Sequence, residues 1–130
     1  MTLATGRPTQ REKGQSTVEF ALVLPVLLIF MLVAVQVGLL VRDYIMVIHA
    51  AREAARSAAV SNGPSGPSTA AQRSGALDPT RMTVMVGQRG GVGSIVTVTV
   101  SFKAPTEVPL IGALVGDYEM TASASMRVEN

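Results

Sequence analysis

A carboxylate stands at the entrance of a long apolar segment. Residues 13–20 read KGQSTVEF. Glu19 lies directly before residues 20–41, a segment that contains no charged side chain. A charge in or beside hydrocarbon is costly and usually serves a function. Glu19 is therefore the first candidate for chemistry, as a group that pairs with a cation in apolar surroundings. The alternative is an ordinary flanking acid among lipid headgroups.

Few other residues have the types or the spacing that catalysis requires. The chain has no cysteine, which excludes disulfides, thiol catalysis and cysteine-bound zinc. His49 is the single histidine, and we interpret it, with Glu53 one turn further on, as a solvated pair rather than a metal site. Residues 87–93, GQRGGVG, lack the Lys-Ser/Thr and the helix that follow a phosphate-binding loop, and predict a hairpin turn. The sequence thus predicts no enzyme, no cofactor and no metal site.

Charge and composition also argue against a nucleic-acid partner. The 130-residue chain has a net charge of only +2, and aromatic residues make up 4% of it. Nucleic-acid binding by the whole chain would call for a stronger basic excess. The length predicts one modest domain.

The apolar segment (residues 20–41) is long enough to cross about 30 Å of hydrocarbon as a helix at about 1.5 Å per residue. A cleaved secretory signal has a shorter apolar region of about 7–15 residues, so we expect a retained, single-pass transmembrane helix in contact with membrane lipid. The leader, residues 1–14, is basic, whereas Arg42 is balanced by Asp43. The positive-inside rule then predicts a cytoplasmic N-terminus and an exported chain after Val41.

The helical pattern continues beyond the apolar segment, so that one helix is predicted from about Ser16 to about Val60. Its polar face carries Arg42, His49, Glu53 and Arg56. The expected packing face consists of Tyr44, Val47, Ile48, Ala51, Ala54, Ala55 and Ala58. The sequence SNGPSGPS then ends the helix, and residues 61–81 are expected to be a linker with one short helical turn.

The C-terminal part, residues 82–130, predicts three strands. Apolar residues alternate with polar ones in residues 82–86, 96–102 and 118–128. Each strand therefore has one apolar face, as in an antiparallel sheet with one side in water. The predicted fold class is α+β, with a long N-terminal helix whose alanine-rich face packs on a small three-stranded antiparallel sheet.

The stretch KGQSTVEFALVLP, together with AAREAARSAAV and a C-terminal SASASMRVE, resembles the TadE-like pseudopilins. These are minor pilin-like proteins of the Flp, or tight-adherence, pilus system, within the type IV pilin-like superfamily. Gln15 stands where ordinary type IV pilins have Phe, and no cysteine pair lies near the C-terminus. Both departures suit the TadE-like proteins better than a major pilin.

The resemblance implies a set of functional residues and partners. A prepilin peptidase would cut after Gly14, Gln15 would become the new N-terminus, and Glu19 would occupy the fifth mature position, followed by Phe20. Glu19 would then pair with an N-terminal amine, its own or a neighbour's, during assembly. The implied partners are other pilin-like subunits, the peptidase and the pilus assembly platform proteins, in a bacterial cytoplasmic membrane and with roles in cell adhesion or secretion.

Two functions therefore remain open from the sequence. The first is a pseudopilin, a structural subunit in Flp/Tad pilus assembly or related secretion. The second is a single-pass, membrane-anchored envelope protein whose small exported domain binds a protein partner. Cleavage at Gly14 would separate the two.

Overall fold

The structure is a computed structural model that describes residues 10–61, 63, 65–74, 77–108, 112 and 116–129. Its elements follow the chain in the order α1 (Gln10–Val60), α2 (Gly66–Ser74), the 3-10 helix η1 (Pro79–Arg81), β1 (Met82–Val86), β2 (Ile95–Ala104) and β3 (Tyr118–Arg127). One long helix packed on a three-stranded antiparallel sheet confirms the predicted α+β class.

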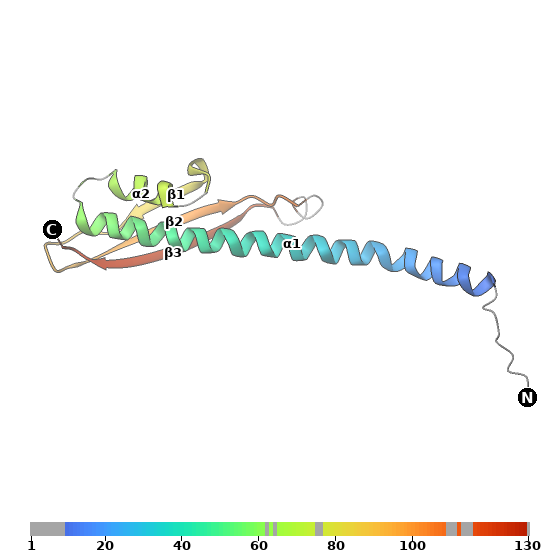
Figure 1. Cartoon of the computed structure of the whole chain (residues 1–130). Helices are drawn as coiled ribbons and strands as arrows, with labels where there is room; N and C mark the ends of the chain where they lie inside the picture. The colour runs from blue at the N-terminus through green and yellow to red at the C-terminus, as the bar shows by residue number, and fades with distance from the viewer. Residues whose placement is uncertain are drawn as a thin grey trace, which may run out of the picture.

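Helix α1 dominates the molecule. It contains 51 residues and is therefore about 77 Å long at about 1.5 Å per residue. It continues through Pro25 and ends at Val60, as the alanine-rich pattern predicts, but it begins at Gln10 rather than at about Ser16. Figure 1 shows its N-terminal half extending beyond the sheet, with none of the other described helices or strands beside it.

The sheet has the strand order β1-β2-β3 with both pairs antiparallel. Val84 lies opposite Val100, and Val100 lies opposite Ala122, so apolar residues share one face. On the other face, hydroxyl side chains pair across β2 and β3, as Thr97 does with Ser125 at 2.8 Å between their oxygens. The alternation of the sequence thus separates a core face from a solvent face.

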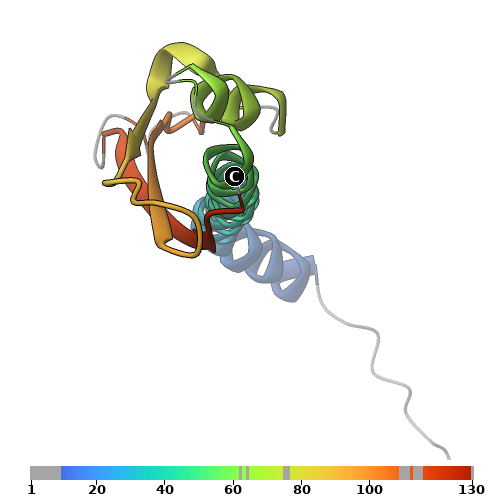
Figure 2. The same cartoon turned by 90° about the vertical axis from the view of Figure 1, so that its left-hand side faces the viewer.

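The core lies between the second half of α1 and the apolar face of the sheet, which curves around one side of the helix (Figure 2). Val47, Ala51 and Ala55 are almost fully buried, as predicted. The buried face is wider than one stripe, because Ala50 and Ala59 are buried as well. Tyr44 was predicted to pack in the core, but it is 48% exposed, because it lies at an open groove beside the start of β3.

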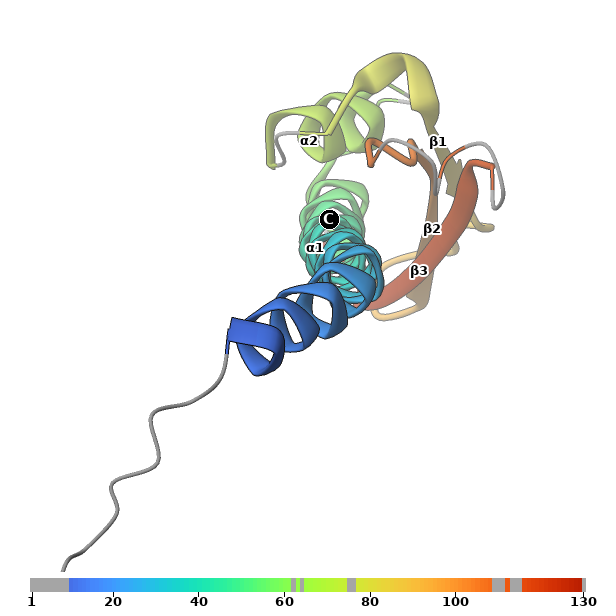
Figure 3. The same ribbon diagram turned by 90° about the vertical axis from the view of Figure 1, so that its right-hand side faces the viewer.

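Helix α2 explains part of the wider core. Residues 61–81 were expected to hold one helical turn, but α2 contains nine residues and packs against α1. Its Pro67 and Ala71 are buried. Figure 3, which views the molecule from its N-terminal end, shows α2 and the sheet on different sides of α1. The sheet and α2 therefore both cover the second half of α1, and the small alanine side chains there allow both to approach closely.

The C-terminal end of α1 is held by backbone and side-chain donors from distant parts of the chain. The carbonyl of Ala59 accepts hydrogen bonds from the Glu129 N–H at 3.1 Å and from Nη2 of Arg89 at 3.3 Å. The last carbonyls of a helix have no partner within it, so such donors stabilise its end. The glycine-rich hairpin turn supplies Arg89, and Gly93 adopts a positive φ of 88° that favours glycine.

Candidate functional site

The predicted site residues Gly14, Gln15, Glu19 and Phe20 lie together on the exposed first turns of α1. Nε2 of Gln15 donates a hydrogen bond of 3.1 Å to Oε1 of Glu19 one turn later. The two side chains therefore share one face of the helix. Phe20 follows with 66% of its surface exposed.

Gly14 lies within the helix, where the fold itself gives no reason for glycine. A Cβ added at this position would meet no atom within 4 Å. Glycine inside a helix costs about 0.5–1 kcal/mol relative to alanine. A structural requirement of this chain therefore does not account for Gly14, which leaves recognition by another molecule as a reason for it.

The helix that carries these residues is apolar and uncovered. The most apolar window of α1 has a mean hydropathy of 2.8 and none of it is buried. Leu22, Leu27 and Phe30 are all more than half exposed. Covering each such side chain stabilises by about 1.5–3 kcal/mol. This surface therefore needs lipid or other helices around it.

Gln36 is a polar residue within the apolar segment. The sequence pattern does not predict it to be a contact site. Only 6% of it is exposed. Its Oε1 accepts a hydrogen bond of 3.3 Å from the backbone N–H of Val108, which precedes β3 in the chain. A lone polar side chain within an apolar run is the signal that could have indicated such a contact.

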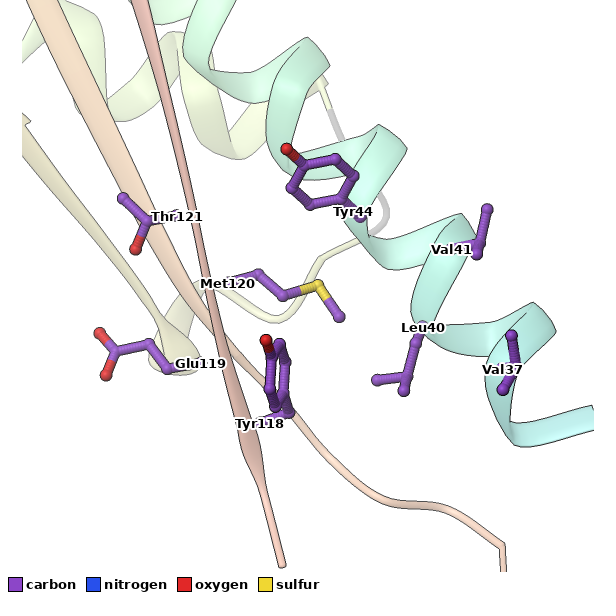
Figure 4. Close-up of a pocket in the computed structure, with 8 residues that line it drawn as sticks. All are labelled: Val37, Leu40, Val41, Tyr44, Tyr118, Glu119, Met120 and Thr121. Atoms are coloured by element: carbon purple, nitrogen blue, oxygen red, sulfur yellow. The ribbon is translucent and has the colours of Figure 1, made fainter. Parts of the chain in front are cut away.

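An apolar groove opens between α1 and the start of β3, with a volume of about 440 Å³. Val37, Leu40 and Val41 line it from α1, together with Tyr44. Figure 4 shows Met120 extending from β3 toward the helix, whereas Glu119 and Thr121 point to the far side of the strand. The wall of the groove is thus mainly apolar.

Charged residues gather around the next turn of α1. Arg42, Asp43, Arg81 and Glu107 line one depression, and Nη1 of Arg81 lies 3.2 Å from a carboxylate oxygen of Asp117. Burial raises the pKa of the Asp43 carboxyl, the positive charge of Arg42 opposes this, and Glu107 raises it further. These charged residues therefore lie at the height of Arg42, directly after the apolar segment. We call this height the charged level.

Nearby, the carboxylate of Asp78 accepts hydrogen bonds at the start of η1 from the hydroxyl and the backbone N–H of Thr80, at 2.7 and 2.9 Å. These two bonds lower the pKa of Asp78. They fix the turn into β1 by capping the short helix.

The structure brings no metal-binding constellation together in the part of the chain that it describes, where no three His, Asp or Glu residues are grouped to hold an ion. His49 is exposed and lies with Glu53 and Arg73 along a polar depression between α1 and α2. The first turns of α1 therefore remain the best candidate site.

In the part of the chain that the structure describes, a long uncovered apolar helix with a small sheet domain on its second half defines a class, that of proteins built around one long apolar helix. Residues 14–56 match the model of the family described as TadE-like protein. This confirms the predicted resemblance over most of α1. The matched segment contains Gly14, Gln15, Glu19 and Phe20, whose roles stay predictions. No curated protein and no solved structure matches the chain.

The family match suggests involvement in the Tad pilus system, whose TadE-like proteins are structural. Together with the apolar helix α1, it suggests a membrane-anchored protein.

Proposed function

We propose that this protein is a minor pilin-like structural subunit, a pseudopilin, in the assembly of a Flp/Tad pilus or a related secretion filament. The observation that carries the proposal is the uncovered apolar helix with Glu19 at its entrance, within the segment that matches the TadE-like family. Such a helix can enter a bundle of similar helices as readily as it can lie in lipid.

The leader in this proposal is removed by a prepilin peptidase, which cuts between Gly14 and Gln15. Cleavage creates an amine at Gln15, one helical turn from the carboxylate of Glu19. Two charges at the end of an apolar bundle are each costly, and pairing them offsets part of that cost. A pair between Glu19 and the amine of a neighbouring subunit would also set the axial register of the two helices.

Cleavage tests the proposal directly. The full chain is expressed with and without a prepilin peptidase, and the mass of the membrane-bound protein is measured. We expect the peptidase to leave a mature N-terminus at Gln15. A chain that keeps residues 1–14 in cells with functional pili would contradict the proposal and favour a plain membrane-anchored envelope protein that binds a partner.

A further inference from the structure

The sheet domain contacts α1 before the apolar segment has ended. Gln36 is buried and accepts the Val108 N–H, although the first charged residue of the helix after Glu19 is Arg42. Gln36 lies about 9 Å before Arg42 at about 1.5 Å per residue. If the apolar segment spans the hydrocarbon up to Arg42, the contact between Gln36 and Val108 lies below the membrane surface.

The chain around Val108 has the polarity that this depth requires. The described residues between Glu107 and Asp117 carry no charged side chain; they are Val108, Gly112 and Gly116. The flanking Glu107 and Asp117 belong to the charged level at Arg42, because Glu107 shares a depression with Arg42 and Asp117 pairs with Arg81. Among the described residues, charge therefore ends at one level on both α1 and the sheet domain.

The hydrogen bond itself fits a position in hydrocarbon. A backbone N–H without a partner costs several kcal/mol where no water is present, so it needs an acceptor within the protein. Gln36 provides that acceptor for Val108.

The groove between α1 and β3 continues the uncovered surface of the apolar segment. Val37 and Val41 are 52% and 54% exposed, on the same helix as the exposed Val33 and Val35. Tyr118 on the opposite wall is 58% exposed. Tyrosine is enriched where a membrane meets water, because its ring is apolar and its hydroxyl is polar.

We infer that the end of the sheet domain nearest the apolar segment is seated in the membrane, with lipid acyl chains in the groove formed by Val37, Val41, Tyr44 and Tyr118. The groove is continuous with the helix surface that the membrane covers, which identifies lipid rather than another protein as its occupant. A depth of about 9 Å for Gln36 is within the range of about 5–10 Å for elements that lie in the interface. The inference rests on membrane anchoring through residues 20–41, but not on a role in a pilus.

Single-cysteine labelling tests this inference, because the chain has no cysteine of its own. Tyr118→Cys and Val41→Cys probe the groove. Val92→Cys, on the β1–β2 hairpin, is the exposed control at 74%, and Leu28→Cys is the control within the apolar segment. Each full-length variant is labelled with an environment-sensitive fluorophore and reconstituted into phosphatidylcholine and phosphatidylglycerol vesicles. Quenching is measured with a water-soluble quencher and with lipids spin-labelled at shallow or deep positions.

We expect shallow lipid labels to quench the probes at Tyr118 and Val41 several-fold more than the probe at Val92. The water-soluble quencher should show the opposite order. If the Tyr118 probe is as accessible to water as the Val92 probe, while deep labels quench Leu28, the domain lies outside the membrane and the inference is wrong. Protection of Tyr118 that grows with protein density but not with lipid labels would also overturn it, in favour of a second copy. If deep labels fail to quench Leu28, the membrane anchor itself is wrong.

Discussion

Gln15 and Glu19 are joined across one turn of α1 by a hydrogen bond of 3.1 Å from Nε2 to Oε1. The residue that would carry the new N-terminal amine after cleavage thus already faces the carboxylate proposed to bind that amine. This hydrogen bond needs only an acceptor oxygen, which a neutral side chain could also provide. The first prediction therefore tests whether the negative charge of Glu19 is needed.

Glu19→Val removes both the charge and the acceptor, whereas Glu19→Gln keeps a similar shape and an acceptor but removes the charge. Membrane insertion and cleavage should survive in both variants, because the apolar segment and Gly14 are unchanged. Filament assembly should fail in both, since an unpaired amine in an apolar bundle is costly. Pilus number by electron microscopy and crosslinking to other pilin-like subunits measure this. Normal pili in the Val variant would make Glu19 an ordinary flanking acid.

The second prediction concerns Gly14. Gly14→Val should abolish leader cleavage without disturbing the helix, because a side chain at this position meets no atom within 4 Å. Gly38→Val is a matched control, since Gly38 is equally open in the same helix and lies far from the cut. Mass spectrometry of the membrane fraction should find residues 1–14 retained only in the first variant. Efficient cleavage of Gly14→Val would place the recognition determinant elsewhere.

The third prediction concerns orientation. The basic leader before the apolar segment and the balanced Arg42 and Asp43 after it predict an internal N-terminus and an external sheet domain. Protease added to spheroplasts should remove an epitope tag at the C-terminus and leave an N-terminal tag intact in cells without peptidase. The reverse result would invert the topology.

The fourth prediction tests the core. Ala55 is fully buried between α1 and its neighbours, so Ala55→Asp should lower the free energy of unfolding by about 3 kcal/mol or more. Arg56 follows Ala55 on the exposed face of the helix. Arg56→Asp should therefore change the free energy of unfolding by no more than about 0.5 kcal/mol. Limited proteolysis of the full chain in detergent compares the two. Equal resistance of both variants would mean that the packing face is misassigned.

The fifth prediction concerns the contact between Gln36 and Val108. Gln36→Leu removes the acceptor of a buried N–H, which costs about 1–3 kcal/mol. The variant should increase hydrogen exchange at the Val108 amide while the amides in the middle of β2 stay protected. Gln88→Leu on the exposed hairpin turn is the control. Unchanged exchange at Val108 would show that Gln36 does not hold this segment.

The sequence by itself determined the elements whose signals are local. The length and polarity of residues 20–41, the alanine pattern up to Val60 and the alternation in three C-terminal stretches predicted α1 and the sheet, because helix and strand periodicities depend on near neighbours. The glycine and the carboxylate of KGQSTVEF likewise indicated the family.

Only the tertiary structure decided which distant residues meet. Helix α2 lacks a strong apolar pattern and is stabilised by its contact with α1, so its extent could not be predicted from residues 61–81 alone. The hydrogen bonds from Val108 to Gln36 and from Arg89 to Ala59 join residues far apart in the chain. Such pairs leave no periodic trace, because their geometry exists only once the sheet has folded against α1. That packing places the end of the sheet beside the apolar segment.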